Sequence, residues 1–252
     1  MIGVKISFDA TAFSRGLNDF ARKQFRYARA RALTATAKAA VVDLQKAMRS
    51  DFNNPTPWTL GAFYAKPATK DDPVAYVVPR EFAGKGTPGW KYLIPEVEGG
   101  DRRMKRFERR IDIGFLVPGN AAELDAYGNV ARGEITQMLA QLNALADTGQ
   151  NANAASNPSW RRKRRGKGAL AVRDARLKRR AQFFLGKSKD GQLGIYRVIS
   201  TGHVARVFSV RPSAPSYSPR LPYFQILTAS ARANFPKEFN KALVEAWRTA
   251  RR

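Results

Sequence analysis

Residues 14–49 read SRGLNDFARKQFRYARARALTATAKAAVVDLQKAMR and decide the fold. This stretch contains no proline and a single glycine, Gly16, and Ser14 is suited to cap the start of a helix. The stretch predicts one long helix, and its alanine-rich part at 30–47 allows a second helix to approach closely. Apolar side chains recur every three or four positions, as along one face of an α-helix: Phe13, Leu17, Phe20, Ala21, Phe25, Ala28, Ala32, Ala35, Ala39 and Val42.

Shorter elements are predicted around this helix. Alternating apolar residues indicate a strand at 4–8, and two β-like runs joined by a proline-containing polar turn indicate a hairpin of 60–66 with 74–78. Short helices are expected at 88–98, 101–111 and 132–146, with a break at 115–119, and three strands are expected at 182–186, 194–200 and 204–212. A C-terminal helix, divided at Pro236, would pack its apolar residues on the core.

These elements predict an α+β fold in which the N-terminal and C-terminal helices pack on short antiparallel strands. Residues 1–146 are expected to form a helix-rich core with an inserted β-hairpin. Residues 147–159 are small, polar and without periodicity, so 147–180 is predicted as a flexible basic segment. Residues 181–252 would contribute the later strands and the last helix to the same domain as 1–146.

The charge balance predicts a polyanionic partner. The chain has 45 Lys+Arg against 20 Asp+Glu, a formal net charge of +25 in 252 residues. Self-repulsion of one-sign charge opposes a compact fold, so such a chain is expected to meet a polyanion that neutralises it. Nucleic acid, an anionic membrane and an acidic protein surface all satisfy this requirement.

Missing residue types exclude several classes of protein. Without cysteine there is no disulfide framework, thiolate zinc site or cysteine nucleophile, and one histidine, His203, excludes a histidine-rich metal site. No run approaches the roughly 18–20 apolar residues of a membrane helix. The first ten residues, MIGVKISFDA, lack the pattern of a signal peptide. We therefore expect a protein that folds in a cytoplasm and has no membrane partner.

The strongest local signal is the basic block at 161–180, which has eleven basic residues and one acidic residue, Asp174. Arginine and lysine neutralise phosphates, and contact with about six phosphates of a duplex would give a log–log salt slope of about −5. No sequence-reading module is visible, so binding would be to the backbone and non-specific. The candidate nucleic-acid-binding residues are Arg161, Arg162, Lys163, Arg164, Arg165, Lys167, Arg173, Arg176, Lys178, Arg179 and Arg180.

Aromatic residues flank this block and leave two alternatives open. Trp160, Phe183 and Phe184 could stack on bases, as aromatic side chains do in single-strand-binding proteins. Large aromatic side chains are more often packed inside, which would make Trp160 a loop anchor and the Phe183/Phe184 pair the start of a core strand.

The sequence does not indicate an enzyme, a cofactor or a metal site. His203 lies in a predicted turn and has no serine or aspartate partner at a recognisable spacing. The acidic residues have neither metal-ligand spacing nor a partnered base: Asp71, Asp72, Glu96, Glu98, Glu108, Asp112, Glu123 and Asp125.

Three blocks resemble proteins encoded among the tail and neck genes of tailed bacteriophages. These blocks are GKGTPGWKYLIPEVEGGDRRMKRFERR at 84–110, LDAYGNVARGEITQMLAQLNAL at 124–145, and the segment from RPSAPSYSPRLPYFQI to NFPKEFNKAL at 211–243. The layout is similar to the minor tail protein Z, or tail-completion, group: an alanine-rich helix, a highly basic middle, short strands and a final helix. This chain is longer than that group through its 51–130 region.

The resemblance implies a virion structural protein at the head-proximal end of the tail, assembled in the bacterial host cytoplasm. There it would complete the tail, join it to the head and contact genomic DNA. Its partners would be tail tube or terminator and connector proteins, and several copies would form a ring-shaped assembly. The alternatives are a free non-specific nucleic-acid-binding protein, a nucleic-acid-processing enzyme that depends on acids such as Glu108 or Glu123, and a basic surface that docks only on acidic tail proteins.

Overall fold

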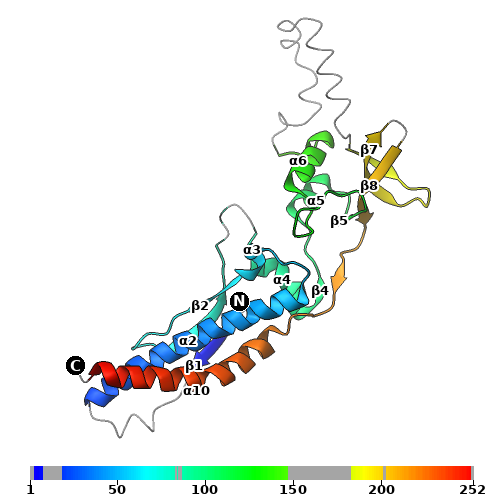
Figure 1. Cartoon of the computed structure of the whole chain (residues 1–252). Helices are drawn as coiled ribbons and strands as arrows, with labels where there is room; N and C mark the ends of the chain where they lie inside the picture. Colours follow the sequence, from blue (N-terminus) through cyan, green and yellow to red (C-terminus); the bar gives the residue numbers. More distant parts are fainter. Residues whose placement is uncertain are drawn as a thin grey trace, which may run out of the picture. The chain divides into compact units, whose positions relative to one another are not determined.

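The computed structural model (Figure 1) describes residues 3–7, 19–82, 84, 87–146, 183–200 and 203–250. The fold is α+β, as predicted. Two compact units are present: unit 1 comprises residues 1–100 and 216–252, and unit 2 comprises residues 101–215. The sequence-based division at 146 and 180 falls at the edge of, or outside, the described residues and stays a prediction.

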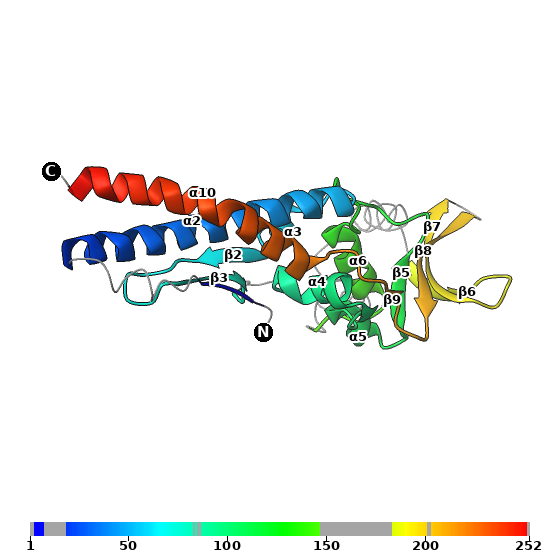
Figure 2. The same ribbon diagram turned by 90° about the horizontal axis from the view of Figure 1, so that it is seen from below.

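Unit 1 is built on two long antiparallel helices, α2 (Asp19–Asp51) and α10 (Tyr223–Ala250), which lie side by side in both views (Figures 1 and 2). Their contact is made by small buried side chains, which let the backbones approach closely: Ala28, Ala32, Ala242 and Ala246. Ion pairing of Arg31 with Glu245 at 2.7 Å and a hydrogen bond from Ser230 Oγ to Asp43 Oδ2 at 2.7 Å fix the register. Ala28 and Ala32 of the predicted apolar face are thus covered by the C-terminal helix. Farther along α2 the prediction is wrong, because Val42 is 49% exposed and the buried positions are Leu33, Ala37, Ala40 and Leu44.

A three-stranded antiparallel sheet packs against α2. Its order is β1-β3-β2, from β1 (Val4–Ser7), β3 (Val74–Pro79) and β2 (Phe63–Lys66), so the predicted hairpin and first strand are confirmed. The described part of unit 1 also has two short helices, α3 (Pro57–Leu60) and α4 (Gly89–Glu98). The largest buried side chain of the core is Tyr223 at the start of α10, which lies against Phe63 of β2 with ring centroids 4.9 Å apart.

The described residues of unit 2 form a four-stranded antiparallel sheet of order β5-β8-β7-β6 and two short helices. The helices α5 and α6 lie on one side of the sheet (Figures 1 and 2), and their apolar residues meet Leu116, Ile195 and Phe208 in a second core. The predicted strands after residue 181 are confirmed. The elements are α5 (Arg106–Ile111), β5 (Phe115–Pro118), α6 (Arg132–Gln141), β6 (Phe183–Lys187), β7 (Leu193–Ser200) and β8 (His203–Arg211). The short strands β4 (Gly100–Asp101) and β9 (Ser216–Tyr217) pair with each other.

Three predictions from the sequence are wrong in detail. The break expected at 115–119 is strand β5, and the glycine of that stretch permits close approach instead: a Cβ at Gly119 would lie 2.5 Å from the Arg206 carbonyl oxygen. Helix α5 begins at Arg106 rather than near 101, because the preceding residue, Lys105, is extended. Helix α6 ends at Gln141 rather than at 146, as Asn143 has a left-handed φ of 57°.

The predicted division of the C-terminal helix at Pro236 is also wrong, since α10 continues through it. Proline lacks the N–H that would bond to the carbonyl of residue 232. The helix continues because residues on both sides of Pro236, such as Leu227 and Ala242, pack in the cores that α10 shares with α2. None of the described helices combines the length and apolar character needed to cross a membrane.

Candidate nucleic-acid interface

The eleven basic residues proposed from the 161–180 block, and Trp160, lie outside the described residues. Within the described part of the chain, the densest basic segment is 102–110, which leads into and forms α5. It has six basic residues in nine positions. Five of them have exposed side chains: Arg103, Lys105, Arg106, Arg109 and Arg110. We call these five residues the α5 basic strip.

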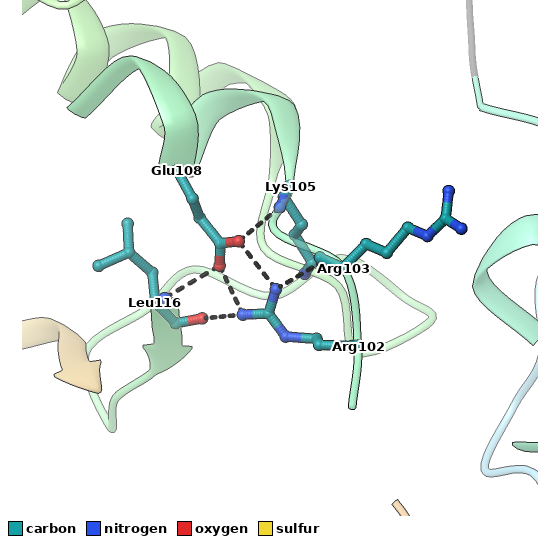
Figure 3. Close-up of polar contacts among 5 residues, drawn as sticks. All are labelled: Arg102, Arg103, Lys105, Glu108 and Leu116. Carbon is teal, nitrogen blue, oxygen red and sulfur yellow. Dashed lines mark hydrogen bonds and ion pairs between the residues drawn. The ribbon is translucent and has the colours of Figure 1, made fainter. Parts of the chain in front are cut away.

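The arginines of the α5 basic strip face solvent, whereas the Lys105 ammonium lies 6.0 Å from the Phe107 ring centroid and burial lowers its pKa. The guanidinium groups of Arg106, Arg109 and Arg110 make no ion pair or hydrogen bond with the described residues. In Figure 3 the Arg103 side chain extends away from the polar cluster beside it. Cations held in this way are free to neutralise phosphates of a polyanion.

The sixth basic residue, Arg102, is turned inward and forms a bidentate ion pair with the buried carboxylate of Glu108 (Figure 3). Arg102 Nη1 donates to Glu108 Oε2 at 2.8 Å and Nη2 donates to Oε1 at 2.5 Å. Nη2 also donates to the Leu116 carbonyl oxygen at 3.2 Å, and the guanidinium lies 5.1 Å from the Phe115 ring centroid. A planar fork matched to a carboxylate is the geometry in which arginine binds most specifically.

Two backbone groups complete the environment of Glu108. The N–H of Lys105 donates to Oε2 at 2.6 Å and the N–H of Leu116 donates to Oε1 at 2.9 Å. Each carboxylate oxygen thus accepts two hydrogen bonds, which uses its full acceptor capacity. Because the donors come from the start of α5 and from β5, Glu108 fixes the basic strip to the sheet.

The pKa of Glu108 reflects this balance. Burial alone would raise it, but the hydrogen bonds from Arg102, Lys105 and Leu116 and the Arg102 charge outweigh burial and lower it below the ordinary value of 4.5. Glu108 is therefore ionised at neutral pH with every acceptor position occupied. A metal ion or substrate would have to displace the Arg102 fork, so these contacts assign Glu108 a structural role.

A second ion-pair cluster, centred on the buried Glu134, joins α6 to β7. Arg197 of β7 pairs with Glu134 at 3.1 Å and with Glu123, and it donates to the Ala121 carbonyl oxygen at 3.0 Å. Glu134 also accepts a 2.7 Å hydrogen bond from the Glu123 N–H. Here burial dominates and the pKa of Glu134 is raised, although Arg197 and the Glu123 N–H oppose the shift. Among the described residues no cluster of three histidine, cysteine or acidic side chains is placed to hold a metal ion.

Unfolding at different pH values should separate these two glutamates by sign. The lowered pKa of Glu108 means that its contribution to stability is present above pH 4.5 and is lost as pH falls through that lowered pKa. The raised pKa of Glu134 gives a contribution that is present below pH 4.5 and lost as pH rises. We expect Glu108→Gln to reduce the fall in unfolding free energy as the pH drops below 4.5. We expect Glu134→Gln to reduce the fall in unfolding free energy as the pH rises above 4.5. Urea unfolding between about pH 3 and about pH 7 measures the unfolding free energy of both variants. If both variants changed its pH dependence in the same direction, the assignment would be contradicted.

The aromatic pair that follows the basic block is divided by the sheet. Phe183 is buried in the unit 2 core, as the core-strand interpretation predicts, whereas Phe184 is 38% exposed. His203 is exposed at the first residue of β8. The Arg102–Glu108 pair was not identified from the sequence, although a glutamate three positions inside a helix start is a known signal for an N-terminal cap.

Comparison with known proteins adds no relative to this picture. No protein-family model, curated protein or solved structure matches the chain.

Proposed function

We propose that this chain is a virion structural protein of a tailed bacteriophage. It acts in tail completion and head–tail joining at the head-proximal end of the tail, where it contacts genomic DNA electrostatically and without sequence preference. The observation that carries the proposal is the concentration of unneutralised cations: a formal net charge of +25, with the α5 basic strip exposed on unit 2. The resemblance of the three sequence blocks to tail-completion proteins supplies the setting.

The proposed mechanism is electrostatic positioning. Lysine and arginine that replace condensed counterions on DNA bind any sequence, and their affinity falls steeply with salt. The buried Glu108 contacts hold the strip in place, so its cations lose less freedom on binding than those of an unanchored segment. The basic block at 161–180 would add further phosphate contacts. Several copies in a ring-shaped assembly, docked on tail tube or terminator and connector proteins, would present these cations around the DNA.

The salt dependence of DNA binding tests the role of the α5 basic strip. Each lost phosphate contact reduces the log–log salt slope by about 0.9. The triple variant Arg106→Gln/Arg109→Gln/Arg110→Gln is therefore expected to reduce the slope for a DNA duplex by roughly 2 to 3. Fluorescence anisotropy at several salt concentrations measures it.

A matched control changes the same charge elsewhere. Arg232, Lys237 and Lys241 are exposed on α10, and the triple glutamine variant removes three charges from unit 1. It should leave the slope nearly unchanged. An equal loss in both triple variants would mean that overall charge, not the α5 basic strip, governs binding.

The location of the protein tests the structural role. Tails and full virions from the producing phage would be compared by mass spectrometry, with crosslinking in the particle. Recovery in tails at a fixed stoichiometry, with crosslinks from 101–111 or 161–180 to DNA, is the expected result. Crosslinks only to acidic residues of tail proteins would keep the location and remove DNA from the mechanism. Absence from particles would overturn the proposal in favour of a free nucleic-acid-binding protein.

A further inference from the structure

The sheet of unit 2 has a second face, opposite the one that packs on α5 and α6. Strand register decides which side chains share it, because paired residues of an antiparallel sheet point to the same side. Phe183 pairs with Arg197, and both belong to the helix-covered face, where Arg197 reaches Glu134 of α6. The neighbouring pair, Phe184 with Tyr196, therefore lies on the other face.

Three side chains form a row across this other face. Phe184 of β6 pairs with Tyr196 of β7, and Tyr196 pairs with Arg206 of β8. The two rings lie nearly parallel, with 25° between their planes and 5.9 Å between their centroids. Arg206 donates a 3.0 Å hydrogen bond to Gln192, which holds its guanidinium at the end of the row. The row thus runs from an exposed ring, through a second ring, to a cation.

Glycines beside the row explain how the rings lie. Gly186 and Gly194 pair with each other in the next row of the same face. A Cβ at Gly186 would lie 3.2 Å from both the Phe184 and Tyr196 rings, and one at Gly194 would lie 3.2 Å from the Tyr196 ring. The rings lean over backbone that carries no side chain. Phe184 supplies the exposed ring at 38%, while Tyr196 is half-buried and its hydroxyl is buried without a hydrogen-bond partner among the described residues. Val198 and Val204 pair with each other on the same face, next to the Tyr196–Arg206 pair and away from the glycines. They extend the apolar surface, and Val204 is exposed.

We infer that the Phe184–Tyr196–Arg206 row is a stacking site for unpaired nucleobases of DNA. A flat aromatic surface accepts the face of any base, and a cation beside it neutralises the adjoining phosphate. The occupant follows from charge: the chain carries a formal net charge of +25, which favours a polyanion over an uncharged apolar protein segment. The inference rests on the proposed DNA contact and adds to it a preference for single-stranded over duplex DNA, since paired bases do not offer their faces.

Removing the ring at position 184 is the direct test. Phe184→Leu retains an apolar side chain but cannot stack, and stacking contributes a factor of roughly 5 to 150 in affinity for each base. The full-length variant is therefore expected to bind a short oligothymidine roughly 5- to 150-fold more weakly than the parent chain, with little change for a DNA duplex. Fluorescence anisotropy with labelled oligothymidine and labelled duplex gives both values.

Leu185→Ala is the matched control, because Leu185 follows Phe184 in the same strand, is similarly exposed at 44%, and shares the helix-covered face with its partner Ile195. It should leave oligothymidine binding within about twofold, and thermal unfolding of each variant checks that the sheet is intact. The stacking site would be overturned if both variants lost oligothymidine affinity equally, or if Phe184→Leu lost none. If duplex binding were retained in either case, the proposed DNA contact would stay in place. Failure of the parent chain to bind either DNA would overturn both.

Discussion

Glu108→Ala is expected to lower the free energy of unfolding of unit 2 by about 3–5 kcal/mol, the usual cost of removing one partner from a buried ion pair. The side chain of Glu108 has no solvent exposure and that of Arg102 has little, so the variant leaves a guanidinium without its counter-charge. It also leaves the Lys105 and Leu116 N–H groups without their acceptor. Native-state hydrogen exchange of peptides that cover β5, β7 and β8 reports the loss within unit 2.

Two further variants make this expectation specific. Glu98→Ala removes an exposed glutamate at the end of α4 and should change stability by no more than about 0.5 kcal/mol. The double variant Arg102→Met/Glu108→Met removes both charges. Its unfolding free energy should fall less than that of Glu108→Ala, because no unpaired charge stays buried. If Glu108→Ala proves as mild as Glu98→Ala, Glu108 does not anchor the basic strip.

Tyr223→Ala should destabilise unit 1 by about 3–5 kcal/mol, as truncation of a large buried aromatic side chain does. Tyr223 is fully buried and contacts Phe63 across the core and Phe224 beside it. It belongs to the cluster in which α2, the sheet and α10 meet, so a cavity there weakens all three. Urea unfolding followed by tryptophan fluorescence measures the loss, since Trp58, Trp90 and Trp247 all lie in unit 1.

Tyr223→Phe removes the hydroxyl and keeps the ring, so it tests the two parts of the side chain separately. The hydroxyl is buried without a hydrogen-bond partner among the described residues, and burial raises the pKa of Tyr223 above its ordinary value. A buried unsatisfied donor is costly, so its removal should leave stability unchanged or raise it by about 1 kcal/mol. Phe224→Ala, at a neighbouring residue that is 52% exposed, should cost much less than Tyr223→Ala. A large loss in Tyr223→Phe would show that the hydroxyl has a partner.

Local periodicity was enough to predict most of the elements. The helical repeat of 14–49 and the alternation at 60–66 and 74–78 are properties of neighbouring residues, and the structure contains the corresponding helix and hairpin. Strand β5 was missed because its pairing partner, β8, is far away in sequence and its flanking glycines resemble a loop. Pro236 misled for the opposite reason: a local rule was overridden by the contacts of α10 with α2 and the sheet.

The functional surfaces, too, were predictable from the sequence only in part. The charge of 102–110 is visible in the sequence, but which of its arginines turns inward depends on where Glu108 meets β5. The alternatives for Phe183 and Phe184 were both open because only strand register assigns one ring to the core and the next to the opposite face. Composition therefore predicts the kind of partner, whereas tertiary pairing decides which residues can meet it.

The division of unit 1 between two separated segments has a consequence during translation. Unit 2 lies between α2 and α10 in the chain, so the ribosome makes all of unit 2 before it makes the helix that covers α2. At ordinary rates of synthesis this interval is on the order of ten seconds or more. During that time Ala28 and Ala32 of the nascent chain have no partner, and Leu33 and Leu44 lack the part of their core that α10 supplies. Unit 2 is thus the first part of the protein able to fold, and unit 1 closes only when α10 emerges.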